Sequence, residues 1–235
     1  MLYILPTPIG NLKDITLRTI EILESIDAVI CEDSRRTGLL LSHYKIKKDL
    51  IIFNDYNEFR IVPQIIQRLK LNQNLALVSD AGSPLISDPG YKLIRECISQ
   101  DISLASLPGP SSVITALTIS GLPPDKFMFI GYLPRKSGHR DIFLKSLNKL
   151  ITMDEKIHPT IILFEAPHKI KTTLQEIKNI FGDINIVICR ELTKIYEETR
   201  REKISQSINH YIKNTPKGEF IILFNIYTQN INIII

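Results

Sequence analysis

Residues 75–90 read LALVSDAGSPLISDPG, and the rest of the chain is interpreted from this stretch. Its first four residues are apolar, as in a buried strand of a parallel sheet. The following residues are rich in Gly, Pro, Ser and Asp, which indicates a long loop. Residues 91–98 are apolar at helical spacing, and Asp88 followed by Pro89 is a typical helix start. The stretch therefore predicts a strand, an elaborate loop and a helix, with the loop at the strand's carboxyl end, where ligands bind in open α/β sheets.

The same order of elements recurs along the chain. Other short apolar segments predict strands at 2–5, 28–30, 50–53, 102–107, 127–132, 160–164, 184–189 and 220–226. Residues 195–204 are charged and fit neither a strand nor a helix clearly. The turn-rich residues 121–125 are the best domain boundary. We therefore predict an α/β protein with an N-terminal α/β domain over 1–121 and a C-terminal α/β domain over 122–235.

The composition excludes several classes of protein. The chain has 235 residues, of which 44% are hydrophobic and 23% are charged, as in ordinary globular proteins. A net charge of +4 permits a polyanionic partner without requiring one. Three widely spaced cysteines argue against a disulfide framework, and no signal peptide or membrane-spanning run is found, so a cytoplasmic location is expected. The histidines lack paired ligand spacing, so no metal site is predicted.

Polar residues follow two of the predicted strands. Glu32, Asp33 and Arg35 come directly after the strand at 28–30. They fit a helix start capped by Asp33 equally well as a polar cluster that faces a ligand. Ser111 and Ser112 precede a helix, and a helix start can also hold a carboxylate or a ribose. These residues predict two α/β halves that bind a small polar ligand between them, but they do not identify a reaction.

A family resemblance supplies the reaction. Residues 2–16, LYILPTPIGNLKDIT, resemble the opening of the ribosomal RNA small subunit methyltransferase I family, which belongs to the tetrapyrrole methylase superfamily. Further blocks resemble the same family in the same order as far as about residue 226, namely 32–37, 78–90, 107–112, 120–123, 165–168 and 190–194. The block at 78–90 is the most specific, whereas the Pro-Gly-Pro-Ser block is shared across the superfamily.

The resemblance implies a homodimeric enzyme that uses S-adenosylmethionine to methylate the ribose 2′-hydroxyl of a cytidine in the decoding region of 16S rRNA. Its partner would be 16S rRNA or the small ribosomal subunit, and no membrane is involved. The cofactor would lie in a cleft between two α/β domains of the tetrapyrrole methylase type. The residues that match the family's cofactor site are Ile9, Asp80, Ala81, Gly82, Ser83, Ile86, Ser111, Ser112, Phe164 and Leu192.

A ribose hydroxyl is a poor nucleophile at neutral pH, so a general base would help the transfer. We hypothesise that Glu32, Asp33 or Glu165 is that base or orients the hydroxyl, because all three follow or end predicted strands. Basic side chains are candidates for contacts with RNA phosphates, although a solvated basic face is an equally good interpretation. They are Arg35, Arg60, Arg135, Lys136 and Arg140.

One departure from the family pattern affects the chemistry. Family members carry two histidines where this chain has Asn54 and Tyr56, so histidine catalysis is not expected at these positions. Two other functions stay open. One is a methyltransferase of the same fold that acts on a tetrapyrrole or another small molecule, and the basic loop at 135–140 argues against it. The other is a non-catalytic RNA-binding protein of ribosome assembly, against which the intact cofactor blocks argue.

Overall fold

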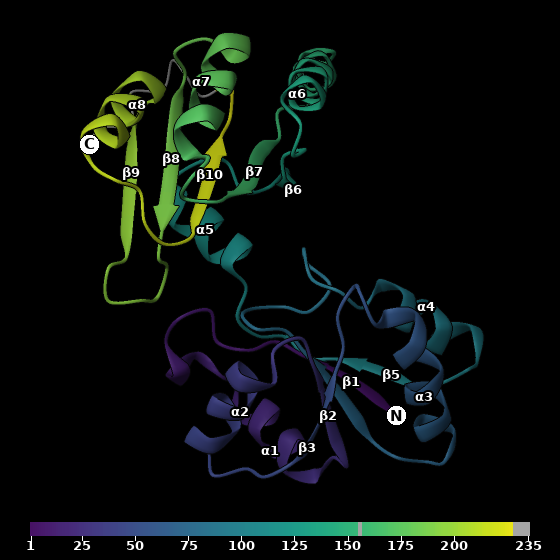
Figure 1. Ribbon diagram of the computed structural model, residues 1–235. Coiled ribbons are helices and arrows are strands. Elements are labelled where there is room, and N and C mark those ends of the chain that lie inside the picture. The colour runs from purple at the N-terminus through teal and green to yellow at the C-terminus, as the bar shows by residue number, and fades with distance from the viewer. Residues whose placement is uncertain (155–156, 228–235) are drawn as a thin grey trace. The chain divides into compact units, whose positions relative to one another are not determined.

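The structure, a computed structural model, describes residues 1–154 and 157–227 and consists of two compact units, Met1–Ser111 and Ser112–Ile235 (Figure 1). The helix α5 (Ser112–Ser120) belongs to the second unit, because it packs against strands β8 (Asn185–Arg190) and β10 (Phe220–Phe224). The two units divide before α5, whereas the predicted domain boundary, after residue 121, lies just after this helix. Residues 228–235 of the predicted second domain lie outside the described residues.

The first unit contains a five-stranded parallel sheet of order β3-β2-β4-β1-β5. In register, Leu2 of β1 lies opposite Leu75 of β4 and Leu104 of β5. Because all strands run the same way, their carboxyl ends meet at one edge of the sheet. The strands are β1 (Leu2–Leu5), β2 (Ala28–Cys31), β3 (Asp49–Ile52), β4 (Leu75–Val78) and β5 (Leu104–Ser106).

Helices cover both faces of this sheet. Alternate residues of a strand point to opposite faces. In β4, Ala76 and Val78 contact the core under α1 and α2, whereas Leu75 and Leu77 contact the core under α3 and α4. The chain leaves β4 toward one face and its neighbours β1 and β2 toward the other, so the strand order changes direction at β4, where ligands bind in open α/β sheets. The helices are the short 3₁₀ helix η1 (Leu12–Asp14), α1 (Leu17–Ser25), α2 (Ser34–His43), α3 (Glu58–Lys70) and α4 (Tyr91–Ser99).

The second unit contains a five-stranded mixed sheet of order β6-β7-β10-β8-β9. Only β6 and β7 pair in parallel, and the other neighbours are antiparallel. One continuous core joins the sheet to α6, α7 and α8. Within the described residues, no helix combines the length and the apolar character needed to cross a membrane. The elements not yet placed are β6 (Phe127–Tyr132), α6 (Ser137–Thr152), β7 (Thr160–Glu165), α7 (Ile170–Phe181), β9 (Glu198–Lys203) and α8 (Ile204–Lys213).

Residues 195–204, whose sequence fits neither a strand nor a helix clearly, contain the edge strand β9 and the first residue of α8. Its charges form a ladder of ion pairs. Arg190 of β8 donates to Glu198 of β9 at 2.9 Å, and Arg200 donates to Glu202 with both distances at 2.9 Å. A charged edge strand also discourages pairing with another chain. Ion pairing rather than apolar alternation therefore explains why the sequence pattern missed this strand.

Candidate active site

The loops after β1 and β4 are joined by backbone hydrogen bonds. Thr7 N–H donates to the Gly82 carbonyl at 2.9 Å, and Gly82 N–H donates back to Thr7 at 2.9 Å. Gly82 has a φ of 82°, and a Cβ there would lie 3.3 Å from Ile9 Cγ2. A side chain at this position would strain the backbone and crowd Ile9. Glycine therefore allows the two loops to meet at the end of the sheet.

The loop after β5 is attached to the same structure. Ser83 donates its hydroxyl to the Pro110 carbonyl at 3.2 Å. A Cβ on Gly109 would lie only 2.9 Å from Pro6 Cβ, so the backbones after β1 and β5 touch. These contacts join the three strand-end loops, residues 6–10, 79–90 and 108–111, which contain seven of the predicted cofactor residues.

One apolar side chain of these loops faces solvent. Ile86 is 47% exposed. Its neighbours Leu85 and Ser87 have φ values of 71° and 68°, a region that residues other than glycine rarely occupy. Such strain persists only where the surrounding structure imposes it, and it is concentrated at ligand sites. An exposed isoleucine held on a strained loop fits a site for a flat apolar ring such as adenine.

Asp33 begins α2 as its N-cap. Its Oδ1 accepts the Arg35 amide at 2.9 Å, and the Arg35 guanidinium donates to both carboxylate oxygens at 3.0 and 2.6 Å. These hydrogen bonds lower the pKa of Asp33 to about 2. The capping interpretation is confirmed. A carboxylate with so low a pKa accepts a proton poorly near neutral pH, so Asp33 is a weak choice for a general base.

Asp80 links the ends of β2 and β4. Its Oδ1 accepts the Asp33 amide at 3.3 Å, and its Oδ2 lies 3.5 Å from Arg36 Nε. These contacts hold its carboxylate between two loops of the first unit. Asp80 therefore shapes the predicted cofactor loop and adds negative charge at the edge of the sheet.

Two further carboxylates line one small depression at this edge, Glu32 after β2 and Asp88 in the long loop. Burial, followed by the charges of Asp80 and Asp55, raises the pKa of Glu32. Burial, followed by the charges of Glu32 and Asp80, raises the pKa of Asp88 to about 6. Like charges in one site oppose each other's ionisation. Raised carboxylate pKa values in a depression are typical of groups that accept or donate protons in catalysis.

Asp88 was not among the predicted site residues, because it was interpreted as a helix cap. In the structure α4 begins at Tyr91, and its N-cap is Gly90, with a φ of 131°. A side chain at Gly90 would meet Leu77 Cδ2 at 3.0 Å. The carboxylate of Asp88 is thereby free of the helix and lines the depression. The glycine directly before the apolar helical pattern is the signal that could have identified the true cap.

The second unit contains the remaining predicted cofactor residues. Ser112 is the first residue of α5. Phe164 of β7 is half-buried and packs edge-on against Phe129 at 4.8 Å and Tyr132 at 5.5 Å between ring centroids. Leu192, in the loop after β8, is only 6% exposed and offers little surface to a ligand. Of the three, Phe164 presents the aromatic surface best suited to an adenine.

Glu165 stands at the end of β7 and is 4% exposed. Its Oε1 accepts the Ala166 amide at 2.7 Å, and its Oε2 accepts the Thr173 hydroxyl. Both carboxylate oxygens are therefore occupied within the unit. The geometry favours a structural role for Glu165, which ties the end of β7 to α7.

Comparison with known proteins places this arrangement in a family. The model of the Tetrapyrrole (Corrin/Porphyrin) Methylases matches residues 1–207. The protein named ribosomal RNA small subunit methyltransferase I from Thermotoga maritima is 42% identical over 224 residues, which cover 95% of this chain and 97% of that protein. The protein of the same name from a Hydrogenobaculum species is 45% identical over 226 residues, with 95% of each chain covered. The chain belongs to the ribosomal RNA small subunit methyltransferase I family of tetrapyrrole methylases.

The fold of this small subunit methyltransferase is also found in solved structures. The X-ray structure of a cobalamin biosynthetic enzyme, cobalt precorrin-4 methyltransferase, matches with a TM-score of 0.68. The match covers 94% of this chain and 93% of the solved chain, at 20% sequence identity. This likeness confirms the predicted α/β fold of the tetrapyrrole methylase type.

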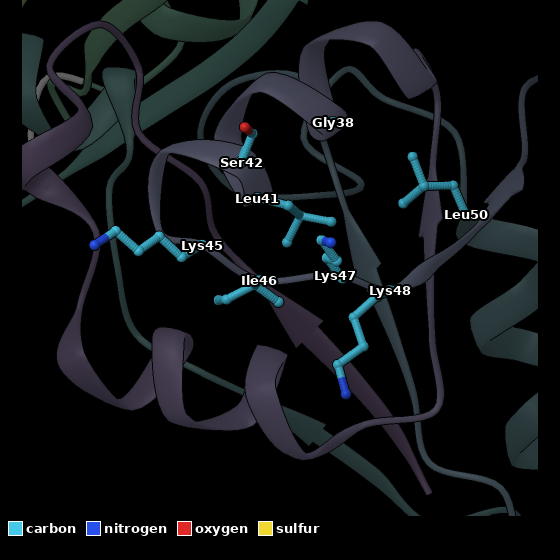
Figure 2. A pocket seen from close by; sticks show the side chains of 8 residues that line it. All are labelled: Gly38, Leu41, Ser42, Lys45, Ile46, Lys47, Lys48 and Leu50. Atoms are coloured by element: carbon cyan, nitrogen blue, oxygen red, sulfur yellow. The ribbon is translucent and has the colours of Figure 1, made fainter.

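Figure 2 shows a pocket of this methyltransferase that the sequence did not predict. It has a volume of about 510 Å³ and lies where α2 leads into β3, at the amino edge of the sheet. The Lys48 ammonium is used within the unit, because it donates to the Glu24 and Ile26 carbonyls at 2.8 and 2.6 Å. The pocket therefore lies apart from the carboxylate edge. Its lining residues are Gly38, Leu41, Ser42, Lys45, Ile46, Lys47, Lys48 and Leu50.

The raised pKa of Asp88 predicts a pH-dependent effect on stability. The carboxyl has a pKa of about 6 when folded and 3.8 as its ordinary value, so folding opposes its ionisation. The wild-type protein should lose stability relative to Asp88→Asn as pH rises through this interval. We expect the variant to be more stable by about 1 kcal/mol at pH ~8, after allowance for solvent screening.

Thermal unfolding of both proteins at about pH 4 and pH 8 measures this effect. At the lower pH Asp88 is neutral in the folded protein, so the advantage of the variant should vanish. An advantage of equal size at both pH values would contradict an origin in ionisation.

Proposed function

We propose that this enzyme transfers a methyl group from S-adenosylmethionine to the ribose 2′-hydroxyl of a cytidine in 16S rRNA of the small ribosomal subunit. The observation that carries the proposal is the 42–45% identity, over 95% of the chain, to proteins named for methylation of small subunit rRNA. The carboxylates at the strand ends of the first unit support it, because transfer to a hydroxyl releases a proton that a base must accept.

The residues present fit the cofactor. Ile86 supplies exposed apolar surface, and the hydroxyl of Ser83 supplies a polar group. When bound, S-adenosylmethionine supplies a methyl group already activated by its sulfonium. The protein is then left to position the hydroxyl in line with that methyl group and to exclude water. Contacts of Phe164 and Leu192 of the second unit with the cofactor are also part of this proposal.

Among the three carboxylates predicted as bases, Glu32 fits the task best. Asp33 is held by Arg35, and Glu165 is buried with both oxygens bonded. Glu32 is exposed, and its raised pKa makes it a better proton acceptor than an ordinary carboxylate. We assign to Glu32 the removal of the 2′-hydroxyl proton. Asp80 and Asp55 act through their charge, which together with burial keeps the affinity of Glu32 for a proton high.

The basic residues predicted to contact RNA differ in their availability. The side chain of Arg35 is 87% exposed, and Arg60, Arg135 and Lys136 are also exposed. Arg140 is different, because its side chain is 11% exposed and donates to both oxygens of Glu176 at 2.7 Å. The four exposed residues are proposed phosphate contacts, although Arg35 also pairs with Asp33, whereas Arg140 fits a structural role.

The proposal also includes a homodimer and a cytoplasmic location. Ribosomal subunits are assembled in the cytoplasm, so an enzyme that modifies them would work there. A dimer would bring two active sites to one particle, and sedimentation of the purified protein measures its oligomeric state.

Methyl transfer tests the proposed function directly. Purified small ribosomal subunits that lack the modification are incubated with the enzyme and labelled S-adenosylmethionine, and the label is mapped to a nucleotide. Label on a single cytidine ribose is expected. Label on a base, or on a small-molecule acceptor and not on rRNA, would contradict the proposal, the second result favouring a small-molecule methyltransferase of the same fold.

A further inference from the structure

Two aromatic side chains near the start of α3 extend fully into solvent. Tyr56 is 100% exposed and Phe59 is 95% exposed. Large apolar rings that gain nothing from burial within their own chain often mark a surface that binds a partner. These two lie three residues apart, one in the loop after β3 and the other in the first turn of α3. We call Tyr56 and Phe59 the aromatic pair.

The backbone under the aromatic pair is held rigidly. Asn54 Oδ1 accepts the amides of Tyr56 and Asn57, both at 3.1 Å. Asn57 Oδ1 accepts the Asn54 amide at 2.9 Å, and its Nδ2 donates to the Ile52 carbonyl at 3.0 Å. Side-chain hydrogen bonds of this kind define a turn. The exposed rings are thus presented by an ordered turn and are not the tips of a loose loop.

An ion pair between a buried glutamate and an exposed lysine fixes the turn at its other end. Glu58 is 5% exposed, and its Oε2 lies 2.8 Å from Lys92 Nζ of α4. Glu58 therefore anchors the first turn of α3 to the neighbouring helix. A binding surface that is already ordered loses little conformational entropy when a partner binds.

The aromatic pair lies beside the carboxylate site. Phe53 precedes the turn, its amide donates to the Cys31 carbonyl at 2.8 Å, and its side chain lines the same depression as Glu32 and Asp88. Asp55, within the turn, lies close enough to raise the pKa of Glu32 by its charge. A nucleotide whose ribose reaches Glu32 would therefore have its neighbours in the strand near the aromatic pair.

We propose that Tyr56 and Phe59 form a stacking platform for unpaired bases of the RNA substrate that flank the methylated nucleotide. This inference rests on the proposed function and names the substrate feature that the site reads. Unpaired bases stack on aromatic side chains, and such contacts tolerate any base. The exposed guanidinium of Arg60, next to Phe59, is available to an adjacent phosphate or base face.

A second copy of the chain is a poorer fit for this surface. The sequence neighbours of the two rings are polar, namely Asp55, Asn57, Glu58 and Arg60. A stable protein–protein interface needs about 800 Å² from each partner with a continuous apolar core. Two separate rings on a polar turn provide much less, whereas a stacked base needs only one ring face.

Steady-state kinetics with small ribosomal subunits tests the platform. Tyr56→Ala and Phe59→Ala should each raise the KM for subunits by about 5- to 150-fold, the range typical for loss of one base stack. The KM for S-adenosylmethionine should stay at its wild-type value. Tyr56→Phe should keep the wild-type KM, whereas Tyr56→Leu should not, because leucine is apolar but cannot stack. Leu71→Ala is the matched control, since Leu71 is 71% exposed and follows α3 at the amino edge of the sheet.

Fluorescence provides a second readout. The chain contains no tryptophan, so Tyr56→Trp introduces a single indole, whose emission can be excited at wavelengths that tyrosine does not absorb. Protein-free 16S rRNA should quench this emission, and it should leave the emission of a Leu71→Trp variant unchanged. Equal KM values for Tyr56→Ala and Leu71→Ala would overturn the platform. A loss of oligomers in Tyr56→Ala, measured by sedimentation, would instead assign the rings to a second copy. If the wild-type enzyme methylates no rRNA, the proposed function itself fails.

Discussion

Glu32→Gln is expected to lower kcat by about 10²- to 10⁴-fold, the range typical for loss of a general base. Glutamine keeps the size and polarity of the side chain but cannot accept the ribose proton. The cofactor loops are held by Thr7, Gly82 and Ser83, which do not depend on this carboxylate. S-adenosylmethionine should therefore bind the variant with wild-type affinity. Single-turnover methyl transfer and calorimetric titration of the cofactor measure the two quantities separately.

The pH profile distinguishes a base from a positioning residue. Glu32 acts only when ionised, and neighbouring charge and burial raise its pKa. The wild-type rate should therefore fall as pH decreases through a pKa above the ordinary value of 4.5. This acidic limb should be absent in Glu32→Gln. Glu24→Gln, an exposed glutamate of α1, is the matched control and should retain wild-type kcat. A wild-type kcat in Glu32→Gln would exclude this residue as the base.

The regular elements of the chain could be predicted because their patterns are local. The strands of the parallel sheet are short apolar runs, and the loops after β1, β4 and β5 are marked by Gly and Pro. The edge strand β9 was missed, because it pairs with β8 through the Arg190–Glu198 ion pair and shows no apolar alternation. Secondary structure that depends on charge pairing between strands cannot be read from the hydrophobic pattern of one segment.

The strand-end positions of the candidate residues could be predicted from the sequence, but the contacts of their side chains could not. Strand ends identified Glu32, Asp33 and Glu165 together, yet a sequence does not show how many partners each carboxylate has. Asp33 is bonded by Arg35, which follows it closely, so its capping role could be weighed from the sequence. Glu165 accepts a hydrogen bond from Thr173, which lies one turn into α7. Both residues are buried, and their burial depends on how α7 packs against the sheet. Asp88 was missed because Asp-Pro is so common a helix start.

Glu165→Ala is expected to destabilise the enzyme by about 2–4 kcal/mol, the range for breaking a buried hydrogen-bonded group. Truncation removes the acceptor for the Ala166 amide and the Thr173 hydroxyl, which both lie in or beside the buried junction of β7 and α7. It also leaves a cavity where the side chain is now 4% exposed. Urea unfolding followed by circular dichroism measures the change.

The same variant separates a structural role from a catalytic one. If Glu165 ties β7 to α7, kcat per folded molecule should stay near its wild-type value at a temperature where Glu165→Ala is folded. Glu165→Gln should lose less stability than the alanine variant, because its carbonyl still accepts one hydrogen bond. Lys171→Ala, an exposed position on α7, controls for truncation on that helix. A large loss of kcat in folded Glu165→Gln, with Glu32→Gln still active, would move the base to the second unit. The polar edge of the first sheet would then serve the cofactor and not the ribose.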